Sequence, residues 1–180
     1  FERTWGWAPE TFAVAFGLMT LILAPISVLF AGWLNDRWFA AGREDAAMRI
    51  MIIAASIEIP MAILTPLMPT PGFALAVLSV AIIGNAMTTA AAPAGLVHIT
   101  PSKYRGLIIA LCYMVISLTG LVLGPGCVGW LSDNIFGNDH LNYAVAATSA
   151  IFGIPVLLLL PYGLHRFRDE LVRRRAQQSA

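Results

Sequence analysis

Long apolar segments alternate with short polar ones along this chain of 180 residues. An α-helix rises about 1.5 Å per residue, so roughly 20 apolar residues cross a bilayer core of about 30 Å. Five segments meet that length: 11–34, 50–68, 73–97, 106–132 and 141–164. Together they contain one charged side chain, Glu58. We therefore predict an all-α integral membrane protein with five complete spans.

Composition supports this prediction. Hydrophobic residues make up 58% of the chain and charged residues 12%, whereas an ordinary soluble domain has about 25% charged residues. The alternative is a large soluble protein in which these helices are buried. It is disfavoured because five such helices in a chain of this length leave too little polar surface to enclose them.

Basic residues are distributed by membrane side. Ten of the eleven fall in every second connection: Arg37, Arg43 and Arg49, then Lys103 and Arg105, then Arg166, Arg168, Arg173, Arg174 and Arg175. The other connections carry only Arg3. Because basic loops stay cytoplasmic, the chain is expected to enter from outside and to end in the cytoplasm. The expected location is a cell membrane, specifically a bacterial inner membrane.

The spans and connections predict three parts: the outer end of a preceding helix and its loop over 1–10, a transmembrane bundle over 11–165, and a basic cytoplasmic tail over 166–180. Trp5 and Trp7 before the first span are typical of an interfacial aromatic belt. No signal peptide pattern opens the chain, so we expect a fragment that begins at the end of an earlier helix. The longest connection, 35–49, is expected to be a loop with room for a short interfacial helix.

Each predicted span contains proline, which removes a backbone hydrogen bond and tends to kink a helix. The positions are Pro25, Pro60, Pro66, Pro93, Pro125 and Pro155. Gly120 and Gly124 lie beside Pro125, which makes this trio a candidate site of helix flexing. Close helix packing alone is the alternative explanation.

A short sequence recurs three spans apart. Gly32-Trp-Leu-Asn-Asp36 ends the first span, and Gly129-Trp-Leu-Ser-Asp133 ends the fourth. An odd number of spans places the two copies on opposite sides of the membrane. Inverted repeats of this kind build many secondary transporters.

The first copy continues into Arg37, and Gly32-Trp-Leu-Asn-Asp36-Arg37 resembles the G-x-x-x-D-R loop signature of the major facilitator superfamily. Pro101-Ser-Lys-Tyr-Arg105-Gly106 is similar to the basic loop before that family's eleventh helix. Gly124-Pro125 followed by the second copy is similar to the eleventh helix of its spinster-like branch.

The resemblance implies the C-terminal six-helix bundle of a twelve-helix fold, with the chain covering the end of helix seven and all of helices eight to twelve. Its partners would be the lipid bilayer, the N-terminal six-helix half and a small-molecule substrate. It implies a symporter or antiporter working by alternating access, with an amphipathic or lipid-like solute if the branch is right. Gly32, Asp36, Arg37 and Arg105 would form the gating loops. The signature departs from the family over 38–43, where the segment before Arg43 is lengthened, which weakens that role.

Asp36 has a physical role independent of the family. A carboxylate at a helix end can accept hydrogen bonds from the N-terminal amides of a neighbouring helix and so hold two bundles together. A basic loop with one neutralising acid is the alternative.

Glu58 lies at mid-span, where an ionised carboxylate costs a few kcal/mol. It must be protonated, paired or facing water, which makes it a candidate for proton coupling. Against this, the corresponding ninth helix is usually peripheral in the family. A protonated Glu58 that bonds the carbonyl freed by Pro60 is the alternative.

Polar residues at helical spacing mark two further faces. Asn85 and Thr89 share one face of their span, as do Tyr113 and Ser117 of theirs. The family's tenth and eleventh helices line the central cavity, so these four residues are candidates for substrate contact. Hydrogen bonding between helices is the alternative.

Two other classes of protein remain open: a membrane-embedded enzyme with Glu58 and His98 as acid and base, and a non-catalytic scaffold or sensor. No nucleophile–base spacing accompanies Glu58 and His98, so we predict no enzyme and no catalytic residues. The three histidines are scattered, so no metal site is predicted, and no cofactor is expected. Nothing indicates binding of nucleic acid, because the arginines follow membrane side.

Overall fold

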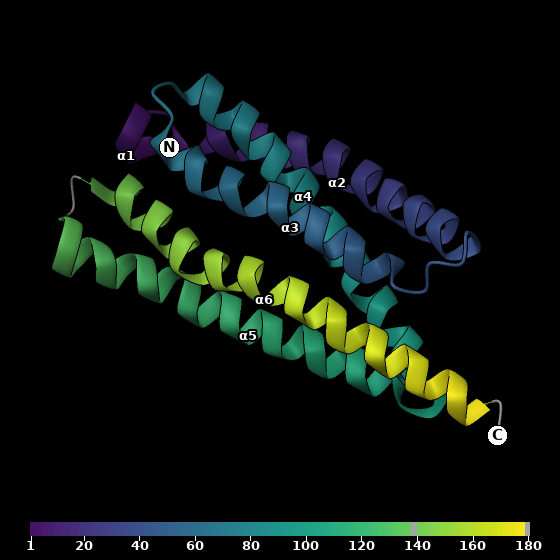
Figure 1. Ribbon diagram of the computed structural model, residues 1–180. Coiled ribbons are helices and arrows are strands. Elements are labelled where there is room, and N and C mark those ends of the chain that lie inside the picture. The colour runs from purple at the N-terminus through teal and green to yellow at the C-terminus, as the bar shows by residue number, and fades with distance from the viewer. Residues whose placement is uncertain (138–139, 179–180) are drawn as a thin grey trace.

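The computed structural model describes residues 1–137 and 140–178, without the side chains of 3–4, 98–99 and 168–178. All regular structure in this part of the chain is helical (Figure 1). The long helices are α2 (Pro9–Ala40), α3 (Ala46–Leu64), α4 (Pro71–Ile99), α5 (Arg105–Leu131) and α6 (Leu141–Gln178). The short elements are α1 (Glu2–Trp5), η1 (Thr65–Leu67), η2 (Ser102–Tyr104) and the π-helical turn η3 (Ser132–Phe136).

The five predicted spans are confirmed as helices. Within the described residues, five helices are long and apolar enough to cross a membrane, each overlapping one predicted segment. Local chemistry explains where several begin: Pro9 and Pro71 open α2 and α4, where the missing amide hydrogen removes no helical bond. The Thr70 hydroxyl then caps α4 by accepting from the amide of Phe73.

The connection expected over 35–49 is much shorter than predicted, which corrects the expectation of a long loop with its own interfacial helix. Helix α2 continues to Ala40, because no glycine or proline interrupts 33–41. The guanidinium of Arg37 lies 5.3 Å from the ring centroid of Trp33, one turn earlier. The chain leaves the helix at Gly42, whose φ of 82° is readily adopted only by glycine. The signature residues Asp36 and Arg37 therefore lie in the helix itself.

Helices α2 to α6 run alternately in opposite directions, and the two chain ends lie at opposite ends of the bundle (Figure 1). The C-terminal ends of α2 and α5 also lie at opposite ends, which places the two copies of the recurring sequence as an inverted repeat would. The backbone of α6 continues to Gln178, so 166–178 of the predicted tail is helical.

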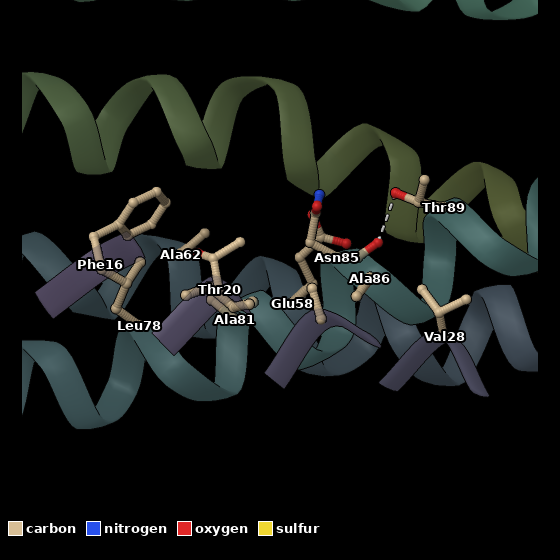
Figure 2. A pocket seen from close by; sticks show the side chains of 12 residues that line it. Phe16, Thr20, Val28, Glu58, Ala62, Leu78, Ala81, Asn85, Ala86 and Thr89 are labelled. Atoms are coloured by element: carbon tan, nitrogen blue, oxygen red, sulfur yellow. Dashed lines mark hydrogen bonds between the residues drawn. The ribbon is translucent and has the colours of Figure 1, made fainter. Parts of the chain in front are cut away.

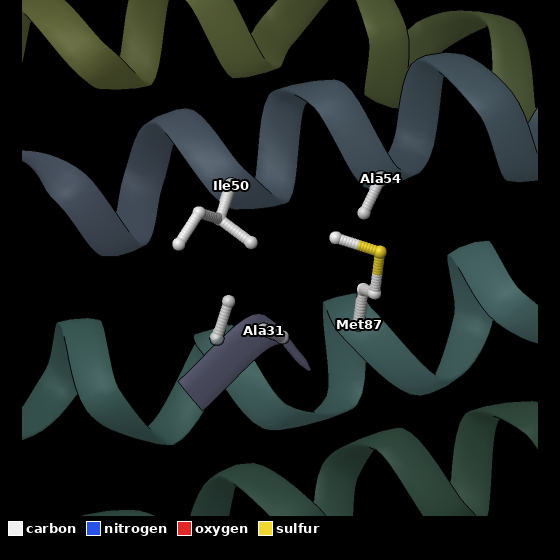
Figure 3. Close-up of a cluster of buried hydrophobic side chains, with 5 residues drawn as sticks. Ala31, Ile50, Ala54 and Met87 are labelled. Atoms are coloured by element: carbon white, nitrogen blue, oxygen red, sulfur yellow. The ribbon is translucent and has the colours of Figure 1, made fainter. Parts of the chain in front are cut away.

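Helices α3 and α4 make the most extensive contact in the bundle. Helix α4 also packs against α2, and α3 against α6, whereas α5 contacts mainly α6. Figure 3 shows the centre of the cluster where α2, α3 and α4 meet. Its buried members are Ala31, Ile50, Ala54, Met87 and Ala91. Small side chains dominate this cluster, as expected where helix backbones approach closely.

Helix α5 is the least covered of the five. No residue of its most apolar stretch is buried inside the bundle, and the Leu121 side chain is 78% exposed. The helix runs without a break through Pro125, as α2, α3, α4 and α6 do through their own internal prolines. Its exposed apolar surface needs a covering of lipid or protein.

Candidate functional site

The candidate site begins where α3 and α4 approach most closely. A Cβ atom built on Gly84 would lie 2.8 Å from the Cβ of Glu58 and 2.9 Å from the carbonyl oxygen of Ala54. Only glycine accommodates that distance between the two helices. The close approach brings the carboxyl group of Glu58 to the polar face of α4.

Glu58 is joined to α4 by two hydrogen-bond contacts. Its Oε1 atom accepts from the Asn85 side-chain amide at 2.9 Å, and its Oε2 atom lies 3.2 Å from the Thr88 hydroxyl. The Thr88 hydroxyl also lies 3.0 Å from the carbonyl oxygen of Gly84. Among the described residues, no basic side chain pairs with Glu58. The alternative in which Glu58 bonds the carbonyl freed by Pro60 is not the arrangement seen.

A pocket of about 430 Å³ opens beside Glu58 between α2, α3 and α4. Figure 2 shows Glu58 and Asn85 side by side, with Phe16 and Leu78 toward one end of the pocket and Val28 toward the other. Its lining residues are Phe16, Thr20, Ala24, Val28, Glu58, Ala62, Leu78, Ala81, Ile82, Asn85, Ala86 and Thr89. Glu58 is the one ionisable group among them. We name this space the Glu58 pocket.

A second cavity, of about 240 Å³, lies between α4 and α5. Asn85 and Thr89 line both this cavity and the Glu58 pocket, so the two spaces meet at one polar face of α4. The Tyr113 hydroxyl, across the second cavity, lies 3.4 Å from the Thr89 carbonyl oxygen and donates to it. Three of the four predicted substrate-contact residues are therefore brought together. Ser117 is exposed one turn farther along α5 and lines neither space.

A third cavity, of about 530 Å³, lies between α5 and α6 and includes Gly120 and Gly124 in its lining. Among the described residues, a Cβ atom on either glycine would meet nothing within 4 Å. In this structure the two glycines therefore do not mediate close packing. Their proposed part in helix flexing, with Pro125, stays a prediction.

The predicted gating residues lie at one end of the bundle. The C-terminal end of α2 and the N-terminal end of α5 are at the same end (Figure 1). Asp36 is exposed, and among the described residues it has neither a hydrogen-bond partner nor an ionic partner. Arg105 donates from Nε to the Thr100 carbonyl oxygen at 3.1 Å. A Cβ on Gly32 would meet nothing within 4 Å in the part of the chain that the structure describes. This end of α2 thus presents an acid with no partner in the described chain.

Reasoning from sequence missed three contributors to the site: Phe16, Thr20 and Thr88. Thr20 carries the clearest signal in the structure, because its hydroxyl oxygen is buried without a partner in the described residues and lines the Glu58 pocket. A polar residue in the middle of an apolar span was the available clue for Thr20. Phe16 carries no such signal.

Within the described residues there is no cluster of three or more His, Cys, Asp or Glu that could hold a metal ion. Cys112 and Cys127 are both free thiols. The side chain of His98, the base in the enzyme hypothesis, lies outside the described residues.

The family model described as Major Facilitator Superfamily matches residues 1–178. Comparison with curated proteins and with solved structures yields no match. The family match covers nearly the whole chain, and the five membrane-length helices fit part of its fold. The chain is therefore a multi-pass integral membrane protein and belongs to the major facilitator superfamily, a family of membrane transporters.

Proposed function

We propose that this chain is the C-terminal half of a secondary active transporter that carries a small amphipathic organic solute by alternating access. In this assignment α2 to α6 are helices eight to twelve, and an N-terminal six-helix bundle covers the exposed faces of α2 and α5. The basic connections and the C-terminus face the cytoplasm of a bacterial cell. The spinster-like branch, with its lipid-like solutes, remains a prediction of the sequence motifs.

The observation that carries the proposal is the meeting of two cavities at Asn85 and Thr89. Asn85 is fourteen residues from the start of its span at Pro71 and twelve from the end at Val97. Transporters of this general kind bind solute near the bilayer midplane. Apolar walls with a few polar groups at that depth suit a small organic molecule.

We further propose that Glu58 couples transport to protons. Its carboxylate has only neutral neighbours in the described chain, and an unpaired charge at mid-membrane is costly. Taking up a proton removes that cost. A carboxylate that binds and releases a proton as the bundle moves would link the two fluxes.

The test uses the full-length protein in proteoliposomes that contain a pH-sensitive dye. Radiolabelled organic amines, organic acids and neutral sugars are supplied outside, and both uptake and internal pH are followed. We expect saturable uptake of at least one class, accompanied by a change in internal pH. Absence of saturable uptake by correctly inserted protein would contradict the transporter assignment.

Coupling is tested with Glu58→Gln, which keeps the size of the side chain and removes its charge. We expect this variant to lose the solute-driven pH change. Asp133→Asn is the matched control, because it removes an exposed acid at the end of α5, away from the pocket. A pH change that survives in Glu58→Gln would exclude Glu58 as the coupling group.

A further inference from the structure

The hydrogen bonds around Glu58 supply too few donors to stabilise an ionised carboxylate. The Thr88 hydroxyl has one hydrogen but two acceptors within reach, Glu58 Oε2 at 3.2 Å and the Gly84 carbonyl oxygen at 3.0 Å. When Thr88 donates to Gly84, an ionised Glu58 keeps one donor, the amide of Asn85. Glu58 is half-buried in the helix bundle, and an ionised carboxylate at this depth of a membrane is costly unless it gains a proton or a cation.

The free polar atoms of the Glu58 pocket are mainly acceptors. Asn85 uses its amide nitrogen on Glu58, which leaves its side-chain carbonyl oxygen available. The Thr20 hydroxyl is buried without a partner in the described residues, lines the same space, and can accept a hydrogen bond as well as donate one. With the carboxylate, these oxygens suit a group that only donates hydrogen bonds. A primary ammonium has three donors and no acceptor.

The rest of the pocket suits an apolar body. Its volume of about 430 Å³ lies within the range of small-molecule sites, roughly 300–1,000 Å³. In Figure 2 the aromatic ring of Phe16 and the side chain of Leu78 lie toward one end, and Glu58 lies between them and Val28. A molecule with an amine at one end and an aromatic group at the other would match this order.

We propose that the Glu58 pocket binds an amphipathic organic cation, with its protonated amine on Glu58 and its apolar body against Phe16 and Leu78. The proposal rests on the transporter assignment only in making this cation the transported solute. Binding of the amine and protonation of Glu58 exclude each other, because both neutralise the same carboxylate.

The test is equilibrium binding of radiolabelled tryptamine to the full-length protein in lipid nanodiscs. Tryptophol and indoleacetate serve as competitors, because they keep the indole ring and replace the amine by a hydroxyl or a carboxylate. We expect tryptophol to compete at least about tenfold more weakly than tryptamine, since it forms no ion pair. Indoleacetate should not compete, because its charge repels Glu58.

Two variants locate the site. Glu58→Gln should weaken tryptamine binding by at least about tenfold and bring it close to that of tryptophol. Ala24→Phe, which fills the pocket but keeps the acid, should weaken the binding of both tryptamine and tryptophol. Asp133→Asn should bind as the wild type does. Far-UV circular dichroism and the elution profile establish that each variant is folded.

Equal affinity for tryptamine and tryptophol in the unaltered protein would overturn the proposal, and that comparison needs no variant. Full tryptamine affinity in folded Glu58→Gln would also overturn it. Solute uptake without amine binding would support the transporter assignment and contradict the proposed amine site in the Glu58 pocket. Amine binding without any uptake would retain the site and contradict transport.

Discussion

Gly84→Ala is the most direct test of the contact that holds Glu58 against α4. The added methyl group would lie 2.8 Å from the Cβ of Glu58, whereas ordinary van der Waals contact begins at 3.4 Å. Both neighbours at this point belong to helix backbone or its first side-chain atom, so neither can rotate away. The helices must separate locally by about 0.6 Å, the difference between 2.8 and 3.4 Å.

The expected loss of stability can be estimated from that displacement. Overpacking costs about 1–3 kcal/mol. The same movement stretches the bond of 2.9 Å between Asn85 and Glu58 to the limit of hydrogen bonding and strains the Thr88 contact. Each hydrogen bond between membrane helices contributes about 0.6 kcal/mol. This close contact should therefore lower the free energy of unfolding of the Gly84→Ala variant by about 2–4 kcal/mol.

Gly95→Ala is the matched control on the same helix. Its Cβ would lie 3.7 Å from the Cβ of Ala47, an ordinary contact with the same partner helix. Both variants gain up to about 1 kcal/mol of helix propensity, so the difference between them isolates the effect of the contact. Unfolding in mixed micelles with increasing SDS, followed by far-UV circular dichroism, measures both. Equal stability of the two variants would refute the reasoning.

Two other substitutions test the core and the end of α2. Ile50→Ala should lower the free energy of unfolding by about 2–5 kcal/mol, because Ile50 is fully buried among the three helices. In the same SDS titration, Ile53→Ala should cost about 0.5 kcal/mol or less, since Ile53 is 44% exposed, and a similar loss for both would contradict the packing described. Gly42→Ala should cost about 1–2 kcal/mol, because φ there is 82° and a side chain is strained in that conformation. Gly32→Ala, inside α2 with open space around it, should be neutral or slightly stabilising, and a loss as large as that of Gly42→Ala would count against a conformational cause.

The spans could be predicted because the information is local. Length and apolarity identify a membrane helix without reference to its neighbours. The end of α2 was misjudged for a related reason: charged and polar residues near Asp36 are typical of a loop, but nothing there breaks a helix before Gly42. Polarity marks where the chain leaves the apolar layer, and glycine and proline mark where the helix ends.

The site was predictable only in part. Glu58 and Asn85 were each singled out as polar residues in apolar spans, but their contact joins residues 27 positions apart. That contact depends on the register of α3 against α4, which the close approach at Gly84 sets. Periodicity within one helix cannot supply such a register. Thr20 was missed for the same reason, because its importance depends on which helix faces α2.

The short connection between α3 and α4 has a consequence for membrane insertion. Only residues 68–70 separate η1 from α4, so the two spans form a tight helical hairpin. Inserted alone, α3 would expose Glu58 to lipid at a cost of a few kcal/mol. When α3 and α4 insert together as a hairpin, the carboxyl group of Glu58 contacts Asn85 and Thr88 before it contacts the acyl chains of the lipid. We therefore expect the translocon to release α3 and α4 together, because α4 supplies the hydrogen-bond partners of the one acid at mid-membrane.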